Sequence, residues 1–195
     1  MIIGLDFETT GLDVDTLSIL EIALVLYDDD LAELDSYTSV VYCPESVLAT
    51  CNPFVKEMHK GSGLWQSAAE GQSLAAVELD LKRLFDKWER HGPLRRMPLM
   101  GNSVHFDRAI LRRFFRDQHD RLHHRNIDAS TVNELARRWA PDMYPDGYMT
   151  HRALDDVRES ARTLREYRKT WLTVSPIARL RILKSRISDA VRRLF

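Results

Sequence analysis

The chain has 195 residues, of which 44% are hydrophobic and 29% are charged, and its formal net charge is −1 at pH 7. This length and composition are typical of one globular domain with a sizeable core, and they exclude a largely disordered or low-complexity protein. The sequence also has no apolar run approaching the roughly 18 residues of a membrane-spanning helix, so we expect no membrane partner.

The first predicted elements are three strands. Residues 2–7 (IIGLDF) form a short apolar run that predicts a buried strand, which ends before Gly11. Residues 21–27 and 36–42 predict the next two strands, and an acidic turn separates them. Three strands in succession indicate an antiparallel meander.

Helices and short strands alternate after this meander. Apolar residues at helical spacing predict a helix over residues 72–90. The remaining elements are predicted at 98–102 (strand or turn), 106–116 (helix), 126–128 (strand), 130–139 (helix) and 152–168 (helix). This order predicts an α/β fold with a mixed sheet.

An acidic pair, Asp6 and Glu8, stands at the end of the first predicted strand. Alternation along a strand places both carboxylates on one face, where they repel each other unless a cation holds them. Oxygen ligands of this kind suit Mg²⁺ or Mn²⁺. Acidic pairs at strand ends are common, however, so this pair alone is a weak indication of a metal site.

Two later segments carry further acidic residues. Residues 101–107 (GNSVHFD) alone would be an ordinary strand-to-helix turn, and residues 151–156 (HRALDD) alone would be an acidic first helical turn that complements the helix dipole. The three patterns D-x-E, N-x3-F-D and H-x-A-x-x-D occur together and in this order. In this combination the chain resembles the DEDDh branch of the DEDD 3′-to-5′ exonucleases.

The likeness extends to the oligoribonuclease family. It rests on segments 4–13 (GLDFETTGLD), 59–64 (HKGSGL), 128–131 (DAST), 134–139 (ELARRW) and 150–160 (THRALDDVRES). The resemblance implies a DnaQ-like, RNase H-type fold with a mixed central sheet and helices on both sides. It further implies a homodimeric 3′-to-5′ exoribonuclease that degrades short RNA, dinucleotides above all, to 5′-mononucleotides.

The resemblance also implies roles for five residues. Two divalent cations, Mg²⁺ or Mn²⁺, would be held by Asp6, Glu8, Asp107 and Asp156, with Asp6 bridging both ions. His151 would be the general base that takes a proton from the attacking water.

The choice between two neighbouring aspartates is open on helix geometry. In a regular helix Asp155 shares a face with His151, whereas Asp156 lies about 140° away. The family pattern selects Asp156. Both statements hold together only if His151 precedes the first regular turn of the helix.

Substrate contacts follow from the same resemblance. The positions that match base-stacking or phosphate-binding residues of the family are Leu12, Phe54, His59, Ser103, Arg125, Ser130 and Thr131. Phe54 replaces the family's tryptophan and is either a stacking or a core residue. His124 replaces a family tyrosine that is contributed across the dimer, so it is either an altered substrate contact or an exposed loop residue.

The end of the chain differs in charge from the rest. Residues 176–195 hold six basic residues and one acidic residue, so the other residues carry 22 basic and 28 acidic side chains, a net charge of −6. We expect an exonuclease domain at residues 1–171 and a basic amphipathic extension at residues 172–195. The extension would dock on the body or a dimer partner, bind nucleic acid, or lie on a membrane surface.

Two other functions remain open on the sequence. Phe106 and the basic tail also fit a broader DEDDh exonuclease that acts on single-stranded DNA or RNA 3′ ends. A nucleic-acid-binding module without catalysis is disfavoured because all four carboxylates and the histidine are present. Cys43 and Cys51 form no CxxC pair and the first residues resemble no signal peptide, so we expect a cytoplasmic protein.

Overall fold

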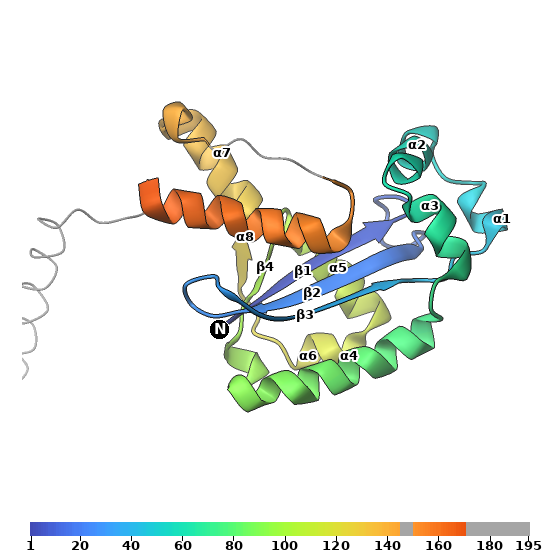
Figure 1. The fold of residues 1–195 in the computed structure, drawn as a ribbon, viewed down its shortest axis with the longest axis horizontal. Helices are drawn as coiled ribbons and strands as arrows, with labels where there is room; N and C mark the ends of the chain where they lie inside the picture. Colours follow the sequence, from blue (N-terminus) through green and yellow to red (C-terminus); the bar gives the residue numbers. More distant parts are fainter. Residues whose placement is uncertain (145–149, 171–195) are drawn as a thin grey trace, which may run out of the picture.

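A five-stranded mixed sheet forms the centre of the computed structural model, which describes residues 1–144 and 150–170 (Figure 1). Its strands are β1 (Ile2–Thr9), β2 (Ile19–Tyr27), β3 (Glu33–Val40), β4 (Leu99–Gly101) and β5 (Asn126–Asp128). The strand order is β3-β2-β1-β4-β5. β1, β2 and β3 pair antiparallel, whereas β4 and β5 continue the sheet parallel to β1. The predicted meander and mixed sheet are therefore confirmed.

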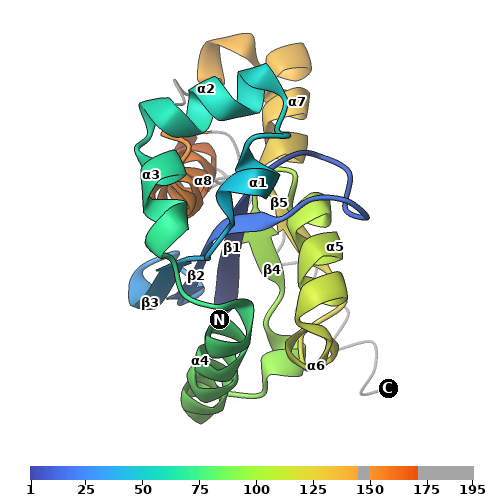
Figure 2. The same ribbon diagram turned by 90° about the vertical axis from the view of Figure 1, so that its right-hand side faces the viewer.

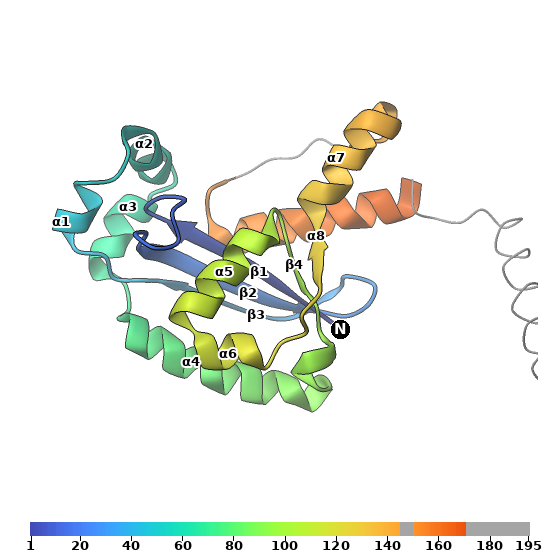
Figure 3. The same cartoon turned by 180° about the vertical axis from the view of Figure 1, so that it is seen from behind.

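Helices cover both faces of the sheet, as expected. α7 (Ala129–Trp139) and α8 (Ala153–Thr170) lie on one face. The other face, seen best in Figure 3, is covered by α4 (Leu74–Trp88), α5 (Val104–Phe114) and α6 (Arg116–Asp120). Short 3₁₀ helices η1 to η4 occupy Ala68–Glu70, Glu89–His91, Leu94–Arg96 and Pro141–Met143.

Strand β2 shows how the sequence divides the core between these two layers. Ile22, Leu24 and Leu26 pack in the cluster that contains α4 and α5, whereas Ala23, Val25 and Tyr27 pack in the cluster that contains α8. Alternate side chains of a strand point to opposite faces, so a continuous apolar strand can fill both clusters. This double burial fixes the register of β2 and β1, and with it the position of the acidic pair on β1.

Three short helices that the sequence pattern did not predict gather at one end of the sheet (Figure 2). They are α1 (Glu45–Leu48), α2 (Pro53–Gly61) and α3 (Leu64–Ser67). Each is too short for its apolar spacing to stand out from a loop. In the part of the chain that the structure describes, no helix combines the length and apolarity needed to cross a bilayer. The extension expected at residues 172–195 lies outside the described residues.

Gly4 lets helix α8 approach strand β1 closely. A Cβ atom on Gly4 would lie 2.5 Å from Cγ1 of Val157 and 3.0 Å from Cε2 of Tyr27. Val157 is β-branched and buried, so it cannot move aside freely. We expect Gly4→Ala to lower the free energy of unfolding in urea by about 1–3 kcal/mol through overpacking. Gly61→Ala, which meets open space, is the control; equal stability of the two variants would contradict the prediction.

Candidate active site

Three segments distant in sequence meet at the C-terminal end of β1. Asp6 and Glu8 lie on β1, Asp107 lies in the first turn of α5, and Asp156 lies in the first turn of α8. Oδ1 of Asp107 accepts a hydrogen bond from the backbone N–H of Phe7, at 3.0 Å, which fixes it beside the acidic pair. The structure thus brings the three acidic segments of the sequence together.

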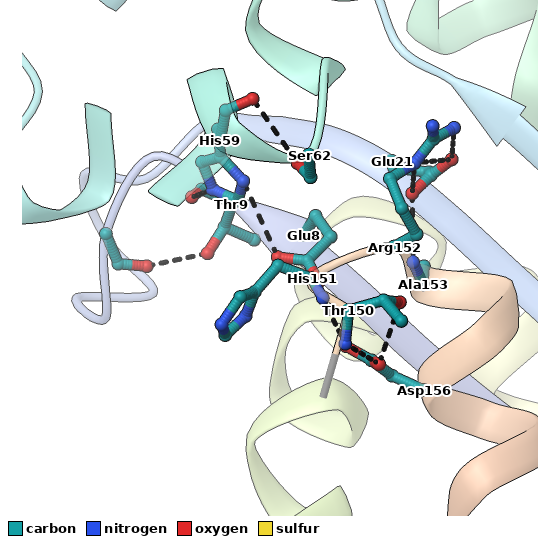
Figure 4. Close-up of polar contacts among 11 residues, drawn as sticks. Glu8, Thr9, Glu21, His59, Ser62, Thr150, His151, Arg152, Ala153 and Asp156 are labelled. Carbon is teal, nitrogen blue, oxygen red and sulfur yellow. Dashed lines mark hydrogen bonds and ion pairs between the residues drawn. The ribbon is translucent and has the colours of Figure 1, made fainter. Parts of the chain in front are cut away.

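The turn before α8 shows which of the neighbouring residues Asp155 and Asp156 lies beside His151 (Figure 4). His151 has a left-handed backbone, with φ of 56°, and precedes the helix rather than continuing it. Asp156 is buried, and its carboxylate accepts the backbone N–H groups of Thr150 at 2.9 Å and His151 at 3.1 Å. Asp155 is exposed. It is therefore Asp156 whose carboxylate lies beside His151.

Burial raises the pKa of all four carboxylates, and the charges of their neighbours raise the pKa of Asp6 and Glu8 further. Burial, followed by the charges of Asp107, Glu8 and Asp156, raises the pKa of Asp6 well above its ordinary value. Burial, followed by the charge of Asp156, raises the pKa of Glu8 to about 8. Burial also raises the pKa of Asp107 to about 7 and that of Asp156 above its usual value. Acidic groups packed in this way favour the binding of a cation, which would let all of them ionise.

A divalent cation fits the donors that the fold assembles. Glu8, His151 and Asp156 each offer one ligand atom, and these three atoms lie within 4.8 Å of one another. Carboxylate oxygens are the donors that hard divalent cations prefer, and an imidazole nitrogen suits Mn²⁺ better than Mg²⁺. Asp6 and Asp107 lie close to this group, because the charge of Asp107 raises the pKa of both Glu8 and Asp6. The residues present therefore suit a metal-binding site.

His59 connects helix α2 to the acidic cluster. It is fully buried, and its Nε2 lies 2.9 Å from the carbonyl oxygen of Thr9, so Nε2 carries the proton. Its Nδ1 lies 3.8 Å from Oε2 of Glu8 and has no hydrogen-bond partner among the described residues. Burial lowers the pKa of His59, which favours the neutral ring. A neutral ring leaves the Nδ1 lone pair facing the site.

The raised pKa values predict how stability depends on pH and metal. An acid whose pKa is higher in the folded than in the unfolded protein stabilises the fold at low pH, and this contribution is lost as pH rises through the folded value. With Glu8 near 8 and Asp107 near 7, the melting temperature of the metal-free protein should fall as pH rises through 7 to 8. At pH 8, Mn²⁺ at about 100 times its dissociation constant should raise the melting temperature by about 5–10 °C.

Thermal melts between about pH 5 and 8.5, with EDTA or Mn²⁺, test this expectation. The variant Asp155→Asn should behave as the wild type, because Asp155 is exposed. A metal-free melting temperature that is constant or rises across this range would contradict it.

Leu12 and Phe54 are two exposed apolar side chains. Leu12 is 83% exposed in the loop after β1, and Phe54 is 75% exposed at the start of α2. Their chain neighbours Gly11 and Asn52 are among the residues lining a cavity of about 220 Å³, together with Thr10, Thr16, Leu17, Val47, Thr50 and Cys51. Of the two readings of Phe54, the structure therefore excludes a core residue.

Besides His59 on α2, the candidate phosphate-binding residues are Ser103, Ser130, Thr131 and Arg125. Ser103 and Ser130 lie together, with their hydroxyls 3.2 Å apart, and Oδ1 of Asp128 accepts the backbone N–H of both at 3.0 Å. Thr131 is the exposed neighbour of Ser130 on α7. Arg125 is exposed in the loop before β5.

His124 lies in that same loop and is also exposed. Its ring stacks on His123, with ring centroids 4.4 Å apart. No contact among the described residues joins His124 to the acidic cluster of its own chain.

Sequence reasoning missed three residues that border the site. Glu21 is buried opposite Glu8 in the sheet register, and Arg152 binds it. Asp128 caps α7 and orders the two serines. A signal for Glu21 was present, because it is the single charged residue in the apolar strand 19–27 and a buried carboxylate requires a partner.

Sequence comparison finds a matching protein family and several similar proteins. The family model described as Exonuclease (RNase_T) matches residues 3–164. The chain is 40% identical over 180 residues to an oligoribonuclease of Leifsonia xyli subsp. xyli, covering 90% of this chain and 86% of that protein. It is 36% identical over 176 residues to an oligoribonuclease of Tropheryma whipplei, covering 88% of this chain and 94% of that protein.

Solved structures show the same fold at low sequence identity. Exonuclease I of E. coli, in complex with a 5cy-dA13 oligonucleotide, matches with a TM-score of 0.65 and 15% identity, covering 86% of this chain and 40% of that chain. Exonuclease I of Methylocaldum szegediense matches with a TM-score of 0.66 and 17% identity, covering 88% and 41%. This chain thus spans about two fifths of those proteins. The likeness identifies the DnaQ-like, RNase H-type fold.

Proposed function

Because this chain belongs to the exonuclease family, in which its relatives are oligoribonucleases, we propose that it is a 3′-to-5′ exoribonuclease that degrades short RNA to 5′-mononucleotides. The observation that carries the proposal is the convergence of Asp6, Glu8, Asp107 and Asp156 from three separate segments, with His151 beside them. A structural role for so many buried acids is disfavoured, because their mutual repulsion destabilises the fold.

In this proposal the four carboxylates hold two divalent cations, Mg²⁺ or Mn²⁺. Bound cations would orient the attacking water and neutralise the charge on the phosphate and leaving oxygens. Asp6, Glu8 and Asp156 would hold one ion, and Asp6 with Asp107 would hold the other. His151 takes the proton of the attacking water as general base. Its place in a turn before the helix leaves its ring free of the regular helical packing.

The candidate stacking and phosphate-binding residues support a preference for dinucleotides. Exposed Leu12 and Phe54 offer apolar surfaces on which bases can stack. The paired hydroxyls of Ser103 and Ser130, with exposed Thr131 and Arg125 nearby in sequence, would bind the terminal phosphate. A terminal phosphate held in this way limits the length of RNA that the site accepts.

We further propose that the enzyme acts as a cytoplasmic homodimer whose catalytic domain comprises residues 1–171. The two cysteines are free, which suits a reducing compartment. Exposed Trp139 and Tyr144, at and after the end of α7, are large aromatic side chains of the kind enriched in interfaces. His124, exposed on its own chain, would then reach the partner's substrate.

The variant His124→Ala tests that substrate contact. Loss of one aromatic stack is expected to lower kcat/KM for an RNA dinucleotide by about 10-fold. His91→Ala, an exposed histidine in η2, is the control and should be neutral. Unchanged turnover of the dinucleotide by His124→Ala would show that His124 is an ordinary loop residue.

Side-by-side digestion of a 5′-labelled RNA dinucleotide, a longer RNA and single-stranded DNA tests the proposed function. We expect rapid, EDTA-sensitive cleavage of the dinucleotide and much slower cleavage of the others. Equal rates on all three substrates would reject the dinucleotide preference and favour a broader exonuclease.

A further inference from the structure

Glu21 is a buried carboxylate within an otherwise apolar strand. Its side chain is 3% exposed, and in the sheet register it lies directly opposite Glu8. A charge in this position is costly unless it is both paired and hydrogen-bonded. Its partners come from a segment 131 or more residues away in sequence.

Those partners are Arg152, in the turn before α8, and Ala153, the first residue of α8. We call the contacts of Glu21 with these two residues the clamp. Nη2 of Arg152 donates to Oε1 of Glu21 at 2.7 Å, and Nε of Arg152 donates to Oε2 at 3.1 Å. Oε2 also accepts the backbone N–H of Ala153 at 2.9 Å. The two-pronged guanidinium bond fixes direction as well as distance.

The clamp supplies a hydrogen-bond acceptor that the sequence at the start of α8 lacks. The first helical hydrogen bond runs from the N–H of Asp156 to the carbonyl of Arg152, at 3.0 Å, so Arg152 occupies the N-cap position. An arginine side chain has no acceptor with which to cap the helix. Glu21 provides that acceptor from the sheet.

His151 lies between two sets of hydrogen bonds that hold the backbone of the turn. On one side the clamp holds Arg152 and Ala153, and on the other Asp156 accepts the N–H groups of Thr150 and His151 (Figure 4). The left-handed backbone of His151 is unfavourable for a residue with a Cβ atom, and it persists where the surroundings enforce it.

We propose that Glu21 and Arg152 are positioning residues that hold the backbone of His151 in its left-handed conformation and thereby aim its imidazole at the acidic cluster. This inference rests on the proposed function, in which His151 is the general base. The clamp acts on turnover rather than on binding of the nucleotide, because it contacts the turn and none of the candidate substrate residues. Its loss would move the base while leaving the exposed stacking residues in place.

The test compares Glu21→Gln, Arg152→Gln and the double variant on an RNA dinucleotide, in steady-state assays over a range of substrate concentrations. A small displacement of a catalytic group can reduce the rate by up to about 100-fold. We expect kcat to fall by about 10- to 100-fold with KM changed less than about 2-fold. The double variant should be no worse than the poorer single variant, because both disrupt one unit. In a His151→Ala background, Glu21→Gln should cause no further loss.

A second bond of the same kind is the matched control. Arg158 on α8 binds Glu33 on β3 in the same two-pronged way, with Nη2 to Oε1 at 2.8 Å and Nε to Oε2 at 3.0 Å. Glu33→Gln and Arg158→Gln should leave kcat unchanged. Arg152→Lys keeps the charge but loses the two-pronged bond, so it gives the same test if Glu21→Gln fails to fold.

A readout without catalysis completes the design. In NMR spectra of the metal-free protein, the backbone and imidazole resonances of His151 should move in Glu21→Gln or Arg152→Lys and stay in place in Glu33→Gln. Unchanged kcat and unchanged His151 resonances would overturn the proposal, as would an equal further loss in the His151→Ala background. Failure of the wild-type protein to cleave the dinucleotide would instead count against the proposed function.

Discussion

Replacing Asp6 by asparagine is expected to lower kcat on an RNA dinucleotide by about 10³-fold or more. Loss of a shared metal ligand removes several kcal/mol of transition-state stabilisation, and each 1.4 kcal/mol corresponds to about a factor of ten. The effect should arise without unfolding, because asparagine has the same shape and one of several mutually repelling charges is removed. The melting temperature of the metal-free variant should therefore equal or exceed that of the wild type at pH 8.

Steady-state cleavage of a saturating 5′-labelled dinucleotide with saturating Mn²⁺ measures this loss. Asp155→Asn is the matched control, since Asp155 is exposed next to buried Asp156 and should be dispensable. Asp156→Asn should resemble Asp6→Asn. Activity of Asp6→Asn within about 10-fold of the wild type would contradict the assignment of Asp6 to the metal site.

Replacing His151 by alanine is expected to lower kcat by about 10²- to 10⁴-fold, the range that a general base contributes. KM should change little, because the stacking and phosphate-binding candidates lie on other segments. His151 also falls within the group of possible metal ligands, so Mn²⁺ affinity separates its two possible roles. If His151 is a general base and no ligand, His151→Ala should leave the Mn²⁺ affinity unchanged. If His151 is a metal ligand, the variant should bind Mn²⁺ more weakly.

The control for this variant is His105→Ala. His105 is an exposed histidine on α5, two residues before Asp107, and its loss should not affect cleavage. A His151→Ala enzyme with normal kcat would require another base, and His59 would then be the next candidate to replace.

Much of the fold was predictable from periodicity. The strand at 2–7, the meander and the helix at 72–90 correspond to β1, to β2 and β3, and to α4 (Leu74–Trp88). Each of these elements is long enough, or apolar enough on both faces, for its hydrophobic pattern to be distinguished from that of a loop. Helices α1 to α3 and α6 are too short for this and were missed. Their positions depend on packing against the sheet rather than on their own sequence.

The sequence by itself determined that acidic pairs, an asparagine–aspartate segment and a histidine–aspartate segment occur in a family order, and hence which chemistry to expect. The family pattern selected Asp156, whereas ideal helix geometry alone favoured Asp155. Only the tertiary structure shows why the two differ: His151 adopts a left-handed turn before the helix, beside the carboxylate of Asp156, and the turn is held by Asp156 and by Glu21 from a distant strand. Contacts between residues more than 100 positions apart arise from sheet order and helix packing, which no local pattern encodes.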